Sequence, residues 1–115
     1  MNIQRLFDRY NQRFWKGELR EWTVDEVHLS ELPAGQHVEQ GSTCADTREI
    51  FIQIGLAPAE KCKTLLHEMC HAAARDDMTH GPLWRKEMLR IGNLGGRGCA
   101  AEARRYERKR ESGIF

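Results

Sequence analysis

L-L-H-E-M-C-H-A-A-A-R, at residues 65–75, is an apolar segment interrupted by three polar side chains at regular spacing. Its apolar residues recur at the three- and four-residue intervals of an α-helix, and Pro58 suits the first turn of such a helix. We therefore expect a helix from Pro58 to about Arg75. Residues four apart on a helix lie about 40° apart in angle and roughly 6 Å apart along the axis. His67 and His71 should therefore project from the same side of this helix.

The order His-Glu-x-x-His on a helix is typical of zinc-dependent hydrolases. Two imidazoles on one side of a helix can bind one ion, and Glu68 projects next to them. Zinc lowers the pKa of a bound water towards ~7, and a neighbouring glutamate can take the proton of that water during attack on a carbonyl. The pattern predicts His67 and His71 as zinc ligands and Glu68 as the catalytic base.

The alternative interpretation of these three residues is a solvated polar stripe without a metal. A shuffled sequence of this composition would contain H-E-x-x-H in about one case in fifty, so the motif alone is not decisive. Its surroundings add weight, because two leucines precede it and three alanines follow it. Two histidines and a glutamate are costly to bury on such a helix without partners. A metal site is the interpretation that supplies those partners.

A catalytic zinc ion usually has three protein ligands and one open position. His80 is our first candidate for the third ligand, because it stands directly before Gly81-Pro82, which should begin the next helix. Asp76 and Asp77 are the alternatives as ligands. We favour a different role for these two residues, as hydrogen-bond acceptors for a histidine N–H or as caps at the end of the preceding helix.

The flanking sequence predicts an α+β fold. Apolar residues recur at helical intervals from Ile3 to Phe14, and E-I-F-I-Q-I-G at 49–55 is rich in the β-branched and aromatic residues of strands. A short turn before residue 49 favours an antiparallel hairpin, and therefore a small antiparallel sheet. The other expected elements are strands at 24–29 and 36–44, a helix from Pro82, a glycine-rich loop at 92–98 and a last helix at 100–110.

The size and composition of the chain exclude several classes of protein. Its 115 residues suit a single domain, and no stretch approaches the ~20 apolar residues that cross a bilayer. The first residues carry charges in place of an apolar signal segment, so we expect a cytoplasmic protein without membrane contact. The four cysteines form no C-x-x-C pair, which favours free thiols and argues against a zinc ribbon.

Positive charge is concentrated near the C-terminus. Residues 84–110 carry a net charge of +6, whereas residues 1–83 carry −4. A basic region of this kind attracts polyanions such as DNA. The solvated face of two helices would give the same composition, and on charge alone we favour that second interpretation.

Three motifs together resemble the SprT-like zinc metallopeptidases, the group that includes the Spartan proteases. These are H-E-M-C-H-A-A at 67–73, H-G-P-L-W at 80–84 and N-Q-R-F-W-K-G-E-L at 11–19, in the family's order. The resemblance covers about residues 1–92, and residues 93–115 add the glycine-rich loop and a basic helix. No zinc ribbon follows, so the likeness is to a compact version of the family.

The resemblance implies a minimal zincin-like fold, with a small sheet packed against the helix that carries the motif. It implies zinc ligands at His67, His71 and His80, with Glu68 as general base. It also implies a protein substrate, since characterised members cleave proteins crosslinked to DNA, often only when DNA is bound. The basic residues of 84–110 would then contact DNA.

The expected function is therefore zinc-dependent endopeptidase activity, with DNA-bound or DNA-crosslinked proteins as possible substrates. A different class of function also fits the motifs, namely a nucleic-acid-binding module with a structural zinc ion and no proteolysis. That alternative requires a protein group, such as Asp76 or Asp77, in the fourth zinc position. The sequence leaves the oligomeric state and the cleavage preference undetermined.

Overall fold

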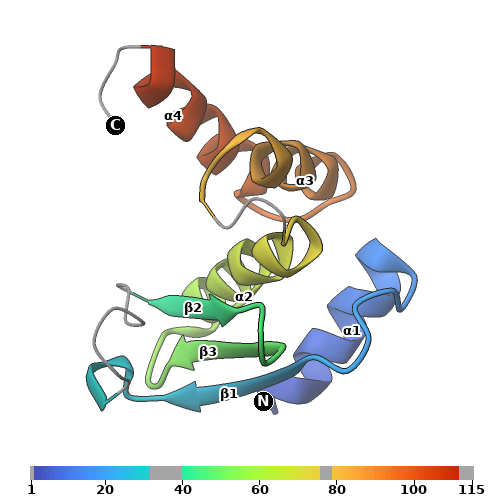
Figure 1. Cartoon of the computed structure of the whole chain (residues 1–115), viewed down its shortest axis with the longest axis vertical. Helices are drawn as coiled ribbons and strands as arrows, with labels where there is room; N and C mark the ends of the chain where they lie inside the picture. Colours follow the sequence, from blue (N-terminus) through green and yellow to red (C-terminus); the bar gives the residue numbers. More distant parts are fainter. Residues whose placement is uncertain (1, 32–39, 76–78, 112–115) are drawn as a thin grey trace.

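The computed structural model describes residues 2–31, 40–75 and 79–111. In chain order the elements are α1 (Ile3–Trp15), β1 (Thr23–Val27), the 3-10 turn η1 (Leu29–Glu31), β2 (Gly41–Cys44), β3 (Glu49–Gln53), α2 (Pro58–Ala73), α3 (Pro82–Asn93) and α4 (Cys99–Glu111). The predicted α+β class is confirmed. Figure 1 shows α2 between the sheet on one side and α3 with α4 on the other, while α1 packs beside β1.

The three strands form a mixed sheet in the order β1-β3-β2. The antiparallel prediction is correct for the hairpin, where Cys44 pairs with Glu49 and Gly41 with Ile52. It is wrong for β1, which runs parallel to β3 with Thr23 opposite Glu49. The reason is geometric: the connections β1–β2 and β2–β3 each reverse the chain, so β3, inserted between the other two strands, points the same way as β1. The structure leaves β2 as an edge strand.

The core lies between the sheet and the helices, and α2 is its central element. Ile50 and Ile52 of β3 are fully buried against α2, where Leu65, Met69 and Cys70 are fully buried in turn. The alternation of buried and partly exposed residues along β3 is the two-residue period expected of a strand with one face on the core. His67 and His71 lie on the side of α2 that contacts α3 and α4.

Side-chain hydrogen bonds fix the position of α1 and of the chain that follows it. Asn2 caps the helix by accepting from the backbone N–H of Arg5 at 3.1 Å. Gln4 accepts from the backbone N–H of Val24 at 3.0 Å and so ties α1 to β1. Asn11 both accepts from and donates to the backbone of Leu19. The helix ends at Trp15, which confirms the helical pattern predicted from Ile3 to Phe14.

The glycine-rich segment is shorter as a loop than predicted. Gly92 and Asn93 belong to α3, α4 begins at Cys99, and only residues 94–98 form the connection. The backbone N–H of Gly96 bonds the carbonyl of Ile91 at 2.8 Å and closes the helix end. A Cβ on Gly92 would lie 2.7 Å from the Cβ of Ala100. Gly92 therefore permits the close approach of α3 and α4 that places α4 over the motif.

Among the described residues, no helix is both long and apolar enough to cross a membrane.

Candidate metal centre

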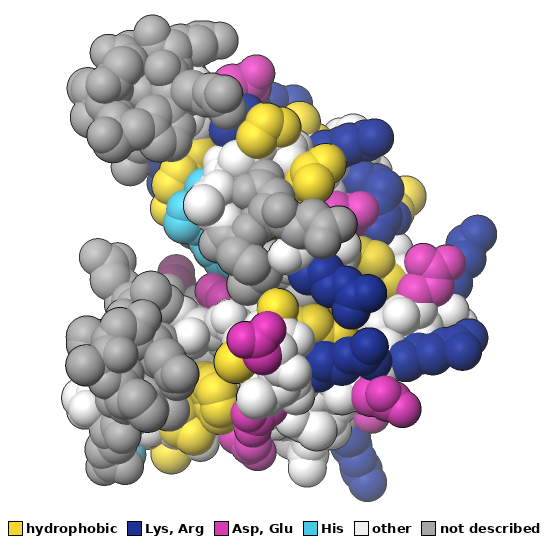
Figure 2. Space-filling model, in the orientation of Figure 1, with side chains coloured by type: hydrophobic (Ala, Val, Ile, Leu, Met, Phe, Trp, Pro, Cys, Tyr) yellow, Lys and Arg dark blue, Asp and Glu magenta, His cyan; other side chains and the backbone are white. Residues whose placement is uncertain are grey.

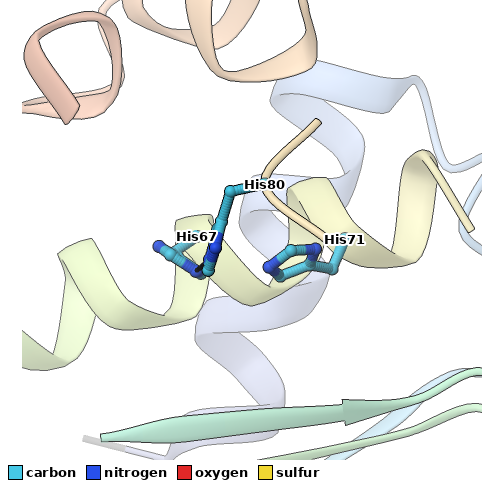
Figure 3. A group of neighbouring side chains, drawn as sticks. All are labelled: His67, His71 and His80. Atoms are coloured by element: carbon cyan, nitrogen blue, oxygen red, sulfur yellow. Dashed lines mark hydrogen bonds between the residues drawn. The ribbon is translucent and has the colours of Figure 1, made fainter. Parts of the chain in front are cut away.

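The three predicted histidines come together on the side of α2 that contacts α3 and α4. Figure 3 shows His67 and His71 projecting from α2 towards His80, which reaches down from the segment before α3. One ring nitrogen from each lies within 4.8 Å of the other two. This set could hold a metal ion, and three histidines are one of the ligand combinations found at zinc sites. Asp76 and Asp77, the alternative ligands, lie outside the described residues.

The spacing within the group supports this chemistry. Nε2 of His80 lies 3.2 Å from Nε2 of His67. Two nitrogens that bind one tetrahedral zinc ion at its usual bond length are separated by about 3.3 Å. The two Nε2 atoms are thus placed as a shared ion would require.

Trp84 of α3 forms one wall of the histidine group. It is fully buried, and its ring stacks on His71 with centroids 5.4 Å apart and an interplanar angle of 21°. Its Nε1–H donates to the backbone carbonyl of His67 at 3.3 Å. Arg85 donates to the backbone carbonyl of His80 at 3.0 Å and holds that residue from behind. Trp84 is therefore a core residue that also lines the histidine group.

Glu68 lies beside the histidines and is oriented by the edge strand. Its carboxylate is buried, with Oε2 3.8 Å from Nε2 of His67. Thr43 of β2 donates to Oε1 at 2.7 Å. Burial raises the pKa of Glu68, although the neighbouring His67 and the bond from Thr43 oppose this effect. Raising a glutamate pKa in this way is typical of carboxylates that act as proton acceptors and donors.

Gly41 provides the room for that arrangement. A Cβ at this position would lie 2.9 Å from Cγ of Glu68, 3.0 Å from Cγ2 of Thr64 and 3.1 Å from Oε2 of Glu68. Real Cβ atoms essentially never approach other atoms below 3.0 Å. Only glycine therefore lets β2 run this close to the carboxylate of α2.

Glu102 of α4 is a site residue that sequence reasoning missed. Its Oε1 accepts a hydrogen bond from Nδ1 of His67. Burial alone would lower the pKa of His67, but this bond and the charges of Glu68 and Glu102 outweigh it, so the pKa of His67 is raised. Burial likewise opposes ionisation of Glu102, yet the bond from His67 holds the pKa of Glu102 below its usual range. The sequence does carry one signal for this role: Glu102 is an acidic residue on the apolar side of a helix that is otherwise basic.

Cys70 and Trp22 lie outside the histidine group. Cys70 is fully buried among apolar residues and is a core residue. Trp22 is also buried and belongs to the core.

Comparison with protein families gives one match. The model of the SprT-like family matches residues 3–107, which is most of the chain and extends beyond the 1–92 of the motif resemblance into α4. Searches against curated proteins and against solved structures give no significant match. The family is one of metallopeptidase-type domains, and the histidine group at the centre of this fold is consistent with that type. On the strength of the family match, this chain belongs to the SprT-like family.

Proposed function

We propose that the chain is a zinc-dependent metalloendopeptidase in which His67, His71 and His80 hold the ion and Glu68 is the general base. Zinc bound there would supply Lewis-acid activation of a water molecule and of the substrate carbonyl. The observation that carries the proposal is the placement of Glu68. One carboxylate oxygen is held by Thr43, while the other lies 3.8 Å from a ligand nitrogen of His67.

In this proposal Glu68 moves the protons of the reaction. Oε2 accepts a proton from the attacking water, and the same carboxyl group later returns it to the leaving amine. The bond from Thr43 to Oε1 keeps the carboxylate from rotating between these two steps.

We further propose that an extended segment of a protein substrate pairs with β2. This strand is at the edge of the sheet, and it lies directly against α2 at the position of Glu68. An exposed edge can bind a peptide through main-chain hydrogen bonds without demanding a particular sequence. A substrate paired there would pass beside the catalytic carboxylate.

The proposed partner besides the substrate is DNA, bound through basic residues of 84–110. Figure 2 shows the histidines left of centre and Lys and Arg side chains along the right side of the same view. The exposed basic residues of the described part of this region are Lys86, Arg97, Arg104, Arg105 and Arg108. Association of the protease with DNA would bring it to DNA-bound or DNA-crosslinked proteins.

We place this activity in the cytoplasm, where the four free cysteines would persist as thiols.

Cleavage of a DNA-binding protein tests the proposal. The zinc-loaded chain is incubated with that substrate, with and without single-stranded DNA, beside Glu68→Gln. The matched control is Glu60→Gln, which removes a carboxylate from an exposed position of the same helix. We expect cleavage by the wild type and by Glu60→Gln and none by Glu68→Gln. Full activity of Glu68→Gln would contradict the mechanism. Zinc bound at one ion per chain without any cleavage would favour the structural-zinc, nucleic-acid-binding alternative.

The DNA contact has its own test. Arg104 and Arg108 are exposed and one turn apart on α4, and Arg5 and Arg9 form the same arrangement on α1. Replacing the first pair by glutamate should weaken DNA binding and reduce its salt dependence, because fewer phosphate charges are neutralised. The same double replacement at Arg5 and Arg9 should leave DNA binding unchanged. Equal effects of the two double variants would exclude α4 as the specific DNA surface.

A further inference from the structure

The helix α4 contacts the histidine group with two side chains of one face. Glu102 accepts a hydrogen bond from Nδ1 of His67. Tyr106, one turn later, stacks on the ring of His80 with centroids 4.1 Å apart and an interplanar angle of 19°. Residues four apart on a helix face the same direction, so both contacts are made at once. The last helix of the described chain therefore touches two of the three histidines.

We propose that Glu102 is a positioning residue of the metal centre, which holds His67 through Nδ1–H so that Nε2 is presented to the ion. This inference rests on the proposed function, because it assumes that the three histidines bind zinc. A hydrogen bond at Nδ1 fixes two properties of the ring: its rotation about the side chain, and the tautomer that leaves the lone pair on Nε2.

The geometry around His67 agrees with this role. With Nδ1 bonded to Glu102, the remaining ring nitrogen is the one that lies 3.2 Å from Nε2 of His80. Glu102 is a buried residue with 8% exposure, so water competes little for its carboxylate. Its other oxygen lies 3.6 Å from Nη2 of Arg105, so each carboxylate oxygen has a charged or polar neighbour.

The position of α4 makes this bond possible, and Gly92 fixes that position. The missing side chain of Gly92 lets Ala100, at the start of α4, pack directly on α3. The first turn of α4 then lies over α2, where Glu102 meets His67. Glu102, which is far from the motif in sequence, is thereby placed in contact with His67.

A purely structural role for Glu102 is the competing explanation. Glu102 lies in the first turn of α4, where a carboxylate stabilises the positive end of the helix. In that case its loss would lower the stability of the metal-free protein and leave zinc affinity unchanged. The two explanations therefore differ in what happens to metal binding, which can be measured without any peptidase assay.

The test compares the full chain with Glu102→Gln, Glu102→Asp and the control Glu107→Gln. Glutamine keeps the shape of the side chain but removes its charge. Aspartate keeps the charge but withdraws the acceptor atom from Nδ1. Glu107 is an exposed carboxylate of the same helix, so Glu107→Gln changes the net charge of α4 equally. Zinc affinity is measured by competition with a chromophoric chelator, and the visible absorption spectrum of the Co²⁺-loaded protein reports the ligand geometry.

We expect Glu102→Gln and Glu102→Asp each to lower zinc affinity by about 10- to 100-fold and to alter the Co²⁺ spectrum. Glu107→Gln should match the wild type in both measurements. Zinc affinity of both Glu102 variants within twofold of the wild type would overturn the inference, whatever the effect on unfolding. An equal loss in Glu107→Gln would overturn it too, because net charge would then be the cause.

The outcomes for the wild type separate this inference from the proposed function. A wild-type chain that binds no zinc overturns both together. A wild type that binds zinc but cleaves no substrate overturns the peptidase proposal, while the affinity comparison still decides the role of Glu102. A cleaving wild type with fully zinc-competent Glu102 variants overturns this inference alone.

Discussion

Thr43 on β2 donates a hydrogen bond of 2.7 Å to Oε1 of Glu68 on α2. Its Oγ1 also lies 3.2 Å from the backbone carbonyl of Glu68. The bond links the edge of the sheet to the residue proposed as general base, so the same strand that would pair with a substrate also sets the direction of the carboxylate.

Replacing Thr43 by valine should lower kcat/KM while leaving zinc binding intact. Valine has the same shape but no hydroxyl group, so Glu68 loses a hydrogen bond to a charged group, which is worth about 1.5–3 kcal/mol. A loss of about 10- to 100-fold in kcat/KM follows if that bond orients the carboxylate. Thr43→Ser should keep most of the activity. Thr23→Val, at an exposed position of β1, is the matched control and should be neutral. Wild-type kinetics in Thr43→Val would show that the bond does not orient the base.

Replacing Gly41 by alanine should destabilise the protein and displace Glu68. The new Cβ would lie 2.9 Å from Cγ of Glu68 and 3.0 Å from Cγ2 of Thr64, so β2 must shift away from α2. Overpacking of this kind costs about 1–3 kcal/mol, which denaturant unfolding measures directly. Ser42→Ala, at the next position of the strand, should change stability by less than about 0.5 kcal/mol. Equal free energies of unfolding for Gly41→Ala and the wild type would contradict this prediction, because β2 could then move away from α2 without loss of stability.

The helix α2 and the gathering of its histidines follow from local sequence. Apolar residues at helical spacing specify the helix, and the helical repeat then brings His67 and His71 to one side. His80 could be proposed because a glycine and a proline fix the start of the next helix directly behind it. The two histidines of α2 and the start of the next helix are separated by short stretches of chain. A helix has a fixed pitch, so a separation in sequence there translates directly into a distance in space.

The features that were predicted wrongly or not at all depend on contacts between distant segments. The parallel pairing of β1 with β3 follows from where β3 inserts in the sheet, and no local pattern encodes that choice. Glu102 meets His67 only because Gly92 lets α4 pack closely on α3. The bond from Thr43 to Glu68 depends in the same way on the register of the hairpin against α2.

Zinc should raise the thermal stability of the protein, and this effect should require His71. A ligand that binds only the folded state at 100 times its Kd adds about 2.7 kcal/mol, which corresponds to roughly 10 °C in Tm for a domain of this size. Addition of a chelator should reverse the shift, and scanning calorimetry measures both changes. His71→Ala should show no zinc-dependent shift, whereas His28→Ala, which alters an exposed histidine, should behave as the wild type. A full zinc response in His71→Ala would exclude His71 as a ligand.

The four cysteines should divide into two reactive and two unreactive thiols. Cys44 and Cys62 are partly exposed, whereas Cys70 and Cys99 are buried. Burial raises the pKa of Cys99 to about 11 and raises the pKa of Cys70 well above its usual value. At pH 8 both buried thiols are therefore neutral, and the thiolate is the reactive form. Alkylation of the native protein with iodoacetamide, followed by peptide mass spectrometry, should modify Cys44 and Cys62 first. Rapid modification of Cys99 in the native state would contradict this.

The raised pKa of Cys99 also predicts how stability changes at alkaline pH. The folded state favours the neutral thiol, so the contribution of this group to stability is complete below the pKa of an unfolded cysteine, about 8.5. That contribution decreases as the pH rises from there towards 11. Urea unfolding at a series of pH values between 8 and 10.5 should show a smaller decrease for Cys99→Ala than for the wild type, because alanine cannot ionise. Parallel decreases in the two proteins would show that other groups cause the loss.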